Sequence, residues 1–427
     1  MAGDSGLLII GSSQAGVQLA VSLRALGFDD SITLLGDENH RPYQRPALSK
    51  EFLQGQVTKE SLIFRSAEYW AEHRIRLARN ERIVSIDKRV DGSGIAHSRS
   101  GATFSFDRLA LTVGARARRL QIDGGDLPGV LYLRNADDAL ELKARAPAAT
   151  DVVVIGGGFI GLEAAASLRK MGKKVTLLEA GPRLVGRATG PEIGDFLLQA
   201  HRGRGIDIVL DARIASLVAA GDAVAGVQMT DGTVIPASIV LIGIGVLPNT
   251  ELAESIGLRC ADGIVVDEFA VASDGVTVAI GDCANLPNPI PGAPPGDRIR
   301  MESVNNAVEQ AKVAAYSITG RQEEYVSIPW FWSNQGDLKL QIAGLSKGYD
   351  QRVVRRYDKP DKLAVLYYRA EQLIAADCVN DPLDFMAVKS ALAQRSNIPA
   401  AAAADCSVML KSITTAASTA VDTGATT

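Results

Sequence analysis

Hydrophobic and polar positions repeat one arrangement twice along the chain. Each copy has a short apolar run that stops at a glycine, a stretch with helical periodicity, and a second apolar run. The segments are Leu7–Ile10, Gly11, Ala15–Leu26 and Ser31–Leu35 in the first copy, and Val152–Ile155, Gly156, Phe159–Met171 and Val175–Leu178 in the second. A continuous apolar run is typical of a strand buried on both faces of a parallel sheet. The pattern therefore predicts two strand–turn–helix–strand units with parallel strands.

The pattern outside these two copies is coarser. Three β-rich runs close at glycines, one helical stretch follows a Pro/Gly loop, and three further strand candidates lie beyond Pro329. They are Asp107–Val113, Ala237–Val246, Thr277–Ile280, Glu302–Ile318, Leu338–Gly344, Arg352–Arg356 and Lys362–Tyr368. From Ala400 the chain is rich in Ala, Thr and Ser and poor in charge, which predicts a disordered tail.

Length and composition narrow the function classes. A chain of 427 residues suggests about three domains. Its net charge of −4 gives it no bulk attraction to nucleic acid or to an anionic membrane. The four cysteines are scattered without a CxxC pair, and the four histidines show no metal-ligand spacing, so we expect no disulfide scaffold and no metal site. No targeting segment is visible at the N-terminus, and we expect a cytoplasmic protein.

The second glycine turn fits the dinucleotide-binding pattern GxGxxG in full. Gly156 permits the tight turn, Gly158 lets the backbone approach a pyrophosphate, and Gly161 lets the helix lie close to the strand. Glu179 closes the next strand, where a carboxylate would bind a ribose hydroxyl. A glycine-rich packing turn is the alternative, but the flanking strand, helix and acid favour a dinucleotide site.

The first glycine turn is an imperfect copy of the second. Gly11, Gly16 and Ala20 fit the pattern, whereas Ser13 stands where the second glycine is expected. Its side chain would crowd the pyrophosphate or donate a hydrogen bond to it. Asp37, just past the second strand, is the candidate ligand for the ribose.

The same turn loosely resembles a GxSxG nucleophile elbow, which would place the chain among the hydrolases. A hydrolase needs a later acid and a later histidine. His201 is the only later histidine that follows a plausible acid, and it lies beside no recognisable motif. Two dinucleotide units instead indicate two dinucleotides, a flavin and a nicotinamide, whose shared chemistry is hydride transfer.

Further segments complete a resemblance to a known family. They are GSSQAG, PYQRPALSK, DRLALTVGARAR, VVVIGGGFIGLE, VTLLE, GIGVLPN, VAIGDCA, RMESVNNAVEQA and PWFWSNQ, and they span nearly the whole chain apart from the tail. The sequence resembles the ferredoxin reductases of bacterial monooxygenase and dioxygenase systems, which are putidaredoxin-reductase-like flavoproteins of the wider glutathione-reductase-like superfamily. It departs from their pattern at Ser13, at Thr112–Gly114 in place of Ala-Thr-Gly, and at Ala47 in place of a proline.

The resemblance implies an α/β fold with two Rossmann-like dinucleotide-binding domains, for FAD and NAD, and a C-terminal α+β domain. The FAD-binding domain would be discontinuous, residues 1–115 and 249–325. The NAD-binding domain would be residues 116–248, the C-terminal domain residues 326–400, and the disordered tail residues 401–427.

The resemblance also implies which residues bind the cofactors. The FAD contacts would be Gly11, Ser13, Ala15, Gly16, Asp37, Lys50, Ile83, Arg134, Asp282 and Val304, and the NADH contacts Gly156, Gly158, Ile160, Gly161, Glu179 and Gly245. Lys50 should approach the flavin ring and pair with Glu163 from the NAD unit. Such a lysine stabilises the charge of the reduced flavin, and the glutamate fixes and balances it.

The electron acceptor follows from the same resemblance. Disulfide reductases of this superfamily carry redox cysteines after the second strand, but residues 39–46 contain no cysteine here. We therefore expect hydride transfer from NADH to FAD, and single electrons passed from an exposed flavin edge to an acidic [2Fe–2S] ferredoxin. That ferredoxin would serve a cytochrome P450 or a ring-hydroxylating dioxygenase. The docking residues would be Arg65, Lys312, Trp330, Trp332 and Lys389.

Two other functions remain open at this point. One is an NADH oxidase or diaphorase-type flavoprotein, which would reduce oxygen or small acceptors. The other is a flavin redox-signalling module that resembles apoptosis-inducing factor. Slow turnover with every acceptor would favour the signalling module.

Overall fold

A computed structural model describes residues 6–290 and 293–416 of the chain. It divides the chain into two compact units. We call residues Met1–Leu184 and His201–Ser327 the N-terminal unit, and residues Val185–Ala200 and Ile328–Thr427 the C-terminal unit. The two units are described separately.

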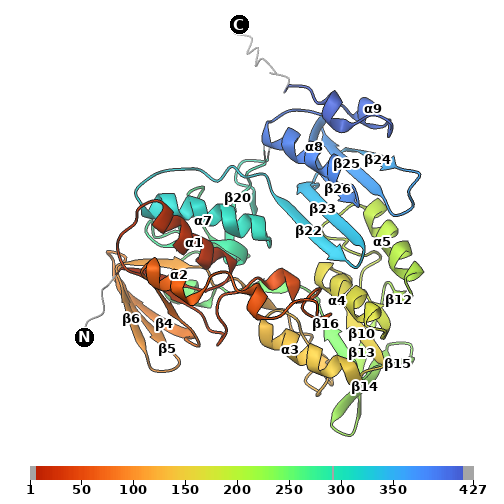
Figure 1. The fold of residues 1–427 in the computed structure, drawn as a ribbon, viewed down its shortest axis with the longest axis horizontal. Coiled ribbons are helices and arrows are strands. Elements are labelled where there is room, and N and C mark those ends of the chain that lie inside the picture. The colour runs from red at the N-terminus through yellow and green to blue at the C-terminus, as the bar shows by residue number, and fades with distance from the viewer. Residues whose placement is uncertain (1–5, 291–292, 417–427) are drawn as a thin grey trace. The chain divides into compact units, whose positions relative to one another are not determined.

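The first parallel sheet of the N-terminal unit has the strand order β19-β7-β1-β2-β3. Its strands are β1 (Leu7–Ile10), β2 (Ile32–Leu35), β3 (Ile75–Ala78), β7 (Arg108–Leu111) and β19 (Val278–Ala279). All four residues of β1 are at most 5% exposed, as expected for a strand covered on both faces. Helices α1 (Gln14–Ala25) and α7 (Val304–Ile318) pack side by side on one face (Figure 1).

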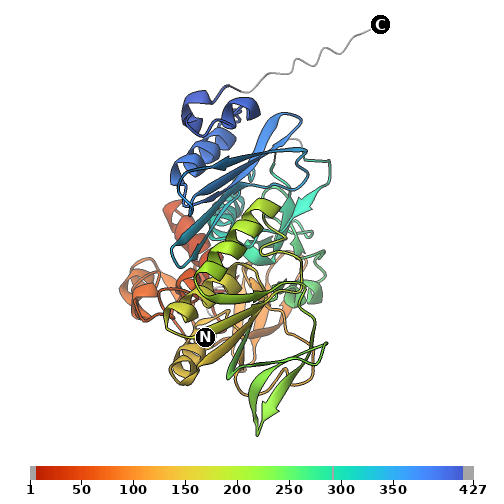
Figure 2. The same ribbon diagram turned by 90° about the vertical axis from the view of Figure 1, so that its right-hand side faces the viewer.

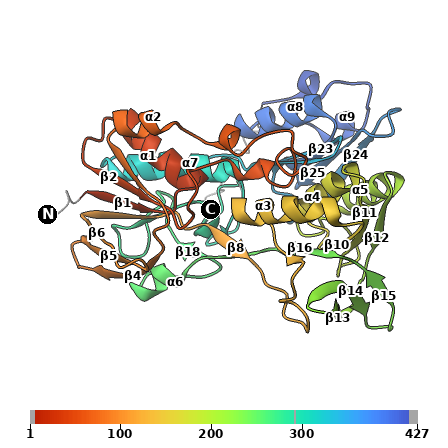
Figure 3. The same ribbon diagram turned by 60° about the horizontal axis from the view of Figure 1, so that its bottom comes forward.

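Smaller elements surround this sheet. The antiparallel strands β4 (Ile83–Lys88), β5 (Gly94–Ser98) and β6 (Thr103–Phe106) lie on the side away from α1 and α7 (Figure 3). The others are α2 (Ala67–Glu72), α6 (Glu251–Ser255), and the strands β18 (Ile264–Val265), β20 (Ala284–Pro287) and β21 (Arg298–Ile299).

The second parallel sheet has the strand order β12-β11-β10-β16-β9. Its first four strands match β3-β2-β1-β7 of the first sheet, whereas the edge strand β9 comes first in the sequence of its sheet and β19 comes last in its own. Its strands are β9 (Val130–Leu131), β10 (Asp151–Ile155), β11 (Lys174–Leu178), β12 (Ile206–Val209) and β16 (Ile239–Ile242). Helices α3 (Ala136–Arg145) and α4 (Phe159–Lys170) accompany it, together with the antiparallel strands β13 (Ile214–Ala220), β14 (Ala223–Met229) and β15 (Val234–Pro236). The internal repeat predicted from the sequence is therefore confirmed, with parallel pairing in both copies.

A two-stranded ribbon joins the two sheets of the N-terminal unit. Strand β8 (Ala115–Ala117) pairs antiparallel with β17 (Val246–Pro248). The chain leaves the first sheet through β8 and returns to it through β17. The predicted domain boundaries at 115/116 and 248/249 fall in this ribbon.

The C-terminal unit is built on an antiparallel sheet in the order β22-β23-β26-β25-β24. Its strands are β22 (Trp330–Gln335), β23 (Leu338–Gly344), β24 (Gln351–Arg356), β25 (Leu363–Arg369) and β26 (Gln372–Val379). Helix α8 (Pro382–Ala393) packs on one face of it (Figure 2). Three of the strands were predicted, whereas β22 and β26 were not.

The segment Val185–Ala200, which contains most of α5 (Pro191–Gly203), belongs to the C-terminal unit, although the sequence analysis assigned it to the NAD-binding domain. The Tyr367 hydroxyl accepts a hydrogen bond from the Gly190 backbone N–H at 3.0 Å and donates one to Asp377 at 2.7 Å. These contacts attach the segment to the sheet.

The prediction of a disordered tail from residue 401 is wrong for residues 401–416. A short helix α9 (Ala400–Ala403) and a 3-10 turn, Leu410–Ile413, follow α8. The buried Arg355 side chain donates hydrogen bonds to the carbonyl oxygens of Ala403, Asp405 and Val408. Residues 417–427 lie outside the described residues.

Within residues 6–290 and 293–416, no helix is long and apolar enough to cross a membrane.

Candidate active site

The backbone geometry of the second turn requires two of its glycines, Gly156 and Gly161. Gly156 follows β10 with φ +112°, and a Cβ there would lie 2.4 Å from the Gly243 carbonyl oxygen. A Cβ on Gly161 would lie 2.0 Å from the Gly156 carbonyl oxygen, so α4 could not approach the strand. A Cβ on Gly158, by contrast, would meet no atom within 4 Å beyond its neighbours. The turn is therefore tight on its inner side and open at Gly158.

The Glu179 carboxylate lies at this turn. Its Oε2 accepts from the Gly157 N–H at 2.6 Å and its Oε1 from the Gly181 N–H at 2.7 Å. Ile160, in the first turn of α4, is 44% exposed, and Gly245 follows β16 with φ +112°. The structure thus brings the predicted NADH-binding residues to the carboxyl ends of β10, β11 and β16.

The first turn has the same backbone but different surroundings. Gly11 has φ +116°, and a Cβ on Gly16 would lie 2.0 Å from the Gly11 carbonyl oxygen. The Ser13 hydroxyl, at the position of the open Gly158, accepts a hydrogen bond from Arg45 Nε at 3.0 Å. The serine therefore orients a guanidinium group beside the turn.

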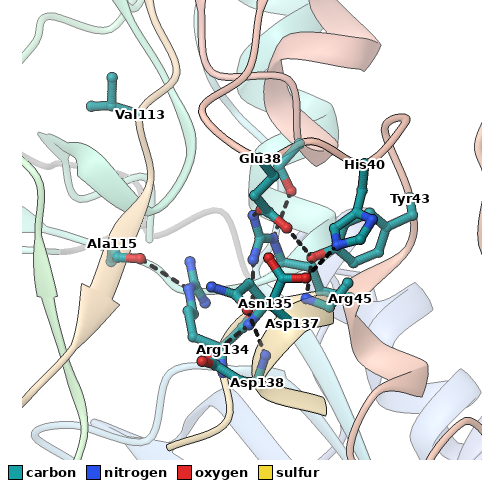
Figure 4. Close-up of polar contacts among 12 residues, drawn as sticks. Glu38, His40, Tyr43, Arg45, Val113, Ala115, Arg134, Asn135, Asp137 and Asp138 are labelled. Carbon is teal, nitrogen blue, oxygen red and sulfur yellow. Dashed lines mark hydrogen bonds and ion pairs between the residues drawn. The ribbon is translucent and has the colours of Figure 1, made fainter. Parts of the chain in front are cut away.

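Arg45 was not identified from the sequence. It donates to the Arg134 carbonyl oxygen at 2.8 Å and pairs with the Glu38 carboxylate (Figure 4). Tyr43 donates to the other oxygen of Glu38 at 2.6 Å. Burial opposes the charge of Arg45, but Tyr43 and Glu38 outweigh it and raise the pKa of the guanidinium. Arg45 is thus a permanent, half-buried cation at the first turn.

The predicted ribose ligand of the first turn, Asp37, is exposed. The next residue, Glu38, is half-buried and holds Arg45 and Tyr43. The motif PYQRPALSK contained both partners, but only the folded chain reveals that they share one carboxylate.

Arg134 and Asp282, far apart in the sequence, form an ion pair. Arg134 donates to Asp282 at 2.8 Å and to the Ala115 carbonyl oxygen at 2.9 Å. Asp282 lies in a single 3-10 turn, Gly281–Cys283, after β19. The Gly281 N–H donates to Gln310 of α7 at 2.6 Å, which ties this turn to the helix.

Three apolar predicted FAD contacts lie around the same sheet. Ile83 begins β4 and is buried, and Val304 is the first residue of α7. Ala15, in the first turn of α1, lies close to Gly281. A Cβ built on Gly281 would be 3.1 Å from the Ala15 methyl group. The first turn, the Asp282 turn and the start of α1 therefore meet at one edge of the sheet.

Lys50 and Glu163 form a buried ion pair within the N-terminal unit. The pair joins the part of the unit that contains the first parallel sheet to the part that contains the second, and we call these parts its two halves. Lys50 Nζ lies 2.8 Å from Glu163 Oε2, and their side chains are 9% and 2% exposed. Glu163 is on α4, the helix that begins at the second glycine turn. The pairing implied by the family resemblance is present in the structure.

Two features of this structure fit bound dinucleotides. The N-cap side chains of α2, α3, α7 and α8 accept hydrogen bonds from their own helices, whereas α1, α4 and the short helices α6 and α9 have no such bond. Of these four uncapped helices, α1 and α4 are the two that begin at the glycine turns. The N–H groups that begin α1 and α4 are thus left for another acceptor, as at a phosphate site. The open space at Gly158 gives such a group room to approach.

Two of the four cysteines, Cys283 and Cys378, are buried thiols. Cys283 is fully buried, and burial raises the pKa of its thiol to about 12. Burial also raises the pKa of Cys378 well above its usual value. Neither thiol forms a nucleophilic thiolate near neutral pH.

The predicted docking residues are divided between the two units. In the N-terminal unit, Arg65 is exposed over the Tyr69 ring and Lys312 pairs with Glu309 at 2.8 Å. In the C-terminal unit, Trp330 and Trp332 stack with ring centroids 5.5 Å apart. Lys389 Nζ lies 4.0 Å from the centroid of the Trp330 ring.

Comparison with known proteins gives consistent relatives. Residues 5–311 match the pyridine nucleotide-disulphide oxidoreductase family, and residues 330–414 match the reductase C-terminal family. Rhodocoxin reductase of Rhodococcus erythropolis is 42% identical over 95% of this chain and 93% of that protein. Putidaredoxin reductase of Pseudomonas putida is 36% identical over 98% of both.

A solved structure supports the same fold. The ferredoxin reductase for the CYP199A2 system of Rhodopseudomonas palustris is 40% identical, with a TM-score of 0.90. The alignment covers 96% of this chain and 99% of that one. The resemblance identified from the sequence motifs is confirmed.

Proposed function

This chain belongs to the pyridine nucleotide-disulphide oxidoreductase family, and we propose that it is an NADH-dependent ferredoxin reductase that uses FAD. One observation carries the proposal. Two glycine turns of matching backbone geometry, each at the start of a helix without a side-chain cap, lie in one compact unit with a buried ion pair between their halves.

The first turn is the site for FAD. Gly11, Gly16 and the start of α1 would hold the pyrophosphate, with Arg45 adding a fixed positive charge beside Ser13. Arg134 and Asp282, held together at 2.8 Å, would orient the chain that links the pyrophosphate to the flavin ring. When bound, FAD supplies the chemistry that links a hydride donor to a one-electron acceptor.

The second turn is the site for NADH. Gly158 and the N-terminus of α4 would receive the pyrophosphate, and Glu179 would accept hydrogen bonds from the ribose hydroxyls. Lys50 would face the flavin ring, with Glu163 as its counter-ion. The protein thus positions two cofactors and adjusts the charge between them, and no side chain needs to act as an acid or base for the hydride.

The acceptor is an acidic [2Fe–2S] ferredoxin that serves a cytochrome P450 or a ring-hydroxylating dioxygenase. The names of the relatives, rhodocoxin reductase and putidaredoxin reductase, support a protein acceptor of this kind. Arg65, Lys312 and Lys389 would steer the ferredoxin, and Trp330 and Trp332 would contact it. Four cysteines without a disulfide among them support a cytoplasmic location.

Three measurements on the purified full-length protein test the proposal. It should carry one non-covalent FAD, NADH should bleach the flavin absorbance, and reduced protein should transfer electrons to a [2Fe–2S] ferredoxin faster than to oxygen. Faster transfer to oxygen would indicate an NADH oxidase instead. Slow turnover with every acceptor, with a stable NADH–flavin charge-transfer complex, would indicate a signalling module.

The docking surface has its own test. Arg65→Glu and Lys389→Glu should each lower kcat/KM for the ferredoxin while NADH–ferricyanide activity stays unchanged. The wild-type ferredoxin rate should also fall as ionic strength rises past about 0.15 M, where the screening length is about 8 Å. A ferredoxin rate that changes with neither salt nor charge reversal would mean that docking is apolar or that the acceptor is not an acidic protein.

A further inference from the structure

Two donors from neighbouring residues converge on a single oxygen of Glu163. The Ser49 hydroxyl donates to Oε2 at 2.5 Å, and the Lys50 ammonium donates to the same atom at 2.8 Å. Ser49, Lys50 and Glu163 are 3%, 7% and 2% exposed, so water does not compete for these contacts. The buried carboxylate therefore has a neutral donor in addition to its counter-ion.

A second set of contacts fixes Ser49 from the same helix. Ser167 lies one turn beyond Glu163 on α4, and its hydroxyl donates to the Ser49 carbonyl oxygen at 2.8 Å. Gln54 donates to the Ser167 hydroxyl oxygen at 3.0 Å. Helix α4 thus forms hydrogen bonds with both the side chain of Ser49, through Glu163, and its backbone, through Ser167. These two hydrogen bonds hold Ser49 in place independently of the Lys50 side chain.

We propose that Ser49 is a positioning residue for hydride transfer, because its hydroxyl holds the Glu163 carboxylate in place when the Lys50 ammonium turns toward the flavin. Removing one partner of a buried ion pair is costly, since it leaves a charge without compensation. A hydroxyl that already donates to the same oxygen lowers this cost, and hydrogen bonds to charged groups are stronger than those between neutral groups. Ser49 therefore makes the separation of Lys50 from Glu163 easier.

This inference rests on the proposed function, in which Lys50 faces FAD. FAD gains negative charge when it is reduced, and a lysine free to turn toward it favours the reduced form. Without the Ser49 hydroxyl, Lys50 should remain with Glu163. Reduction should then become slower and less favourable, while NADH binding at the second turn should stay the same.

The test compares Ser49→Ala with variants that isolate the hydroxyl. Ser49→Cys keeps the volume but has only a weak donor, and it carries the test if the alanine variant does not fold. Ser49→Thr retains a hydroxyl and should restore the wild-type values. Ser61→Ala removes an exposed serine whose hydroxyl donates only to the Thr58 carbonyl oxygen, and it is the matched control. Glu163→Gln, alone and with Ser49→Ala, completes a double-mutant cycle.

The readouts are the FAD midpoint potential, the limiting rate of FAD reduction in stopped flow, and the NADH concentration that gives half that rate. Ser49→Ala should slow the limiting rate about ten-fold without a change in half-saturation. A ten-fold change in the reduction equilibrium lowers the potential by about 30 mV for a two-electron couple. In the Glu163→Gln background, removing Ser49 should have little further effect.

Wild-type values for Ser49→Ala and Ser49→Cys would overturn the inference. An undiminished effect of Ser49→Ala in the Glu163→Gln background would also overturn it, because Ser49 would then act through another group. A comparable change in Ser61→Ala would make the effect non-specific. If the wild-type protein itself binds no FAD or is not reduced by NADH, the proposed function fails rather than the role of Ser49.

Discussion

The two glycine turns have one backbone geometry in two different settings. Gly11 and Gly156 have φ +116° and +112°, and a Cβ on the last glycine of each turn, Gly16 or Gly161, would lie 2.0 Å from the carbonyl oxygen of the first. At the first turn, Arg45 donates a hydrogen bond to the Ser13 hydroxyl. The second turn has only open space at the equivalent Gly158.

This difference between the turns matches the two ligands that we propose for them, a cofactor that remains bound and a substrate that exchanges. A half-buried guanidinium, fixed by Glu38 and the Arg134 carbonyl oxygen, would add an anchor for the pyrophosphate that we propose at the first turn. At the second turn, the anchor is the N-terminus of α4 and the single carboxylate of Glu179. In the proposed function FAD would stay bound through many turnovers, whereas NADH would enter and leave in each. We therefore expect Arg45 to strengthen binding at the turn whose ligand must stay.

The largest expected effect comes from Asp282, whose 3-10 turn lies beside the first glycine turn. Asp282→Ala removes the partner of Arg134, and loss of a charge-assisted pair of this kind should weaken FAD binding by about ten-fold or more. The FAD content of the purified variant, measured by absorbance, should fall well below one per chain. Asp87→Ala, which removes an exposed carboxylate of β4, is the control and should keep its FAD. Full flavin content in Asp282→Ala would contradict the assignment of the first turn.

Gly158→Ala tests the second turn in the same way. The added methyl group would occupy the open space that the pyrophosphate needs, so KM for NADH should rise about ten-fold or more while FAD content stays the same. Gly203→Ala also places a methyl group in open space, but away from either turn, and should behave as wild type. A loss of FAD in Gly158→Ala would mean that the two sites are not separate.

The sequence predicted the repeated part of the fold well. Buried parallel strands such as β1 and β10 read as unbroken apolar runs, and glycines mark the turns that only glycine can form. Strand β26 was missed because it carries Asp377, a polar residue that is fully buried against Tyr367. The order in residues 401–416 was missed because Arg355, distant in sequence, supplies its hydrogen bonds.

The candidate site was predicted where a local motif or a family resemblance names its residues. Gly156, Gly158 and Glu179 follow from spacing alone, and the resemblance supplied Lys50 and Glu163. No local pattern distinguishes Arg45 or Ser49 from surface residues. Their roles depend on atoms contributed by Glu38, Ser13 and Glu163, which only tertiary contacts bring near them.

Arg45→Met would sharpen the comparison, because it makes the first turn more like the second. The variant replaces the arginine with an apolar side chain of similar length and removes the charge beside Ser13. FAD should still bind, with a dissociation constant about ten-fold higher, which titration of the apoprotein would measure. Arg41→Met, at an exposed position of the same segment, is the matched control. Unchanged FAD affinity in Arg45→Met would mean that the guanidinium only packs Glu38 and Tyr43.

Glu179→Ala concerns the choice between NADH and NADPH at the second turn. The carboxylate can accept from the adenosine ribose and repels a 2′-phosphate. Its removal should lower the ratio of kcat/KM for NADH to that for NADPH about ten-fold, mainly through weaker use of NADH. Asp207→Ala, an exposed carboxylate on the neighbouring strand β12, should leave the ratio unchanged. A wild-type protein that uses both cofactors equally would contradict the role of Glu179.

The smallest effect is expected from the cysteines, including Cys283 beside Asp282. Burial raises the pKa of the Cys283 thiol to about 12, so the thiol stays protonated near neutral pH. Raising the pH from 6 to 9 should therefore not make Cys283 of the folded protein react with a maleimide, although denaturant should. Cys→Ser substitutions at Cys260, Cys283, Cys378 and Cys406, one at a time, should leave ferredoxin reduction within about three-fold of wild type.

Cys283→Ser should lower thermal stability, because it places a hydroxyl in the core. A collapse of turnover with FAD retained in any of the four would mean that electrons leave the first turn through sulfur.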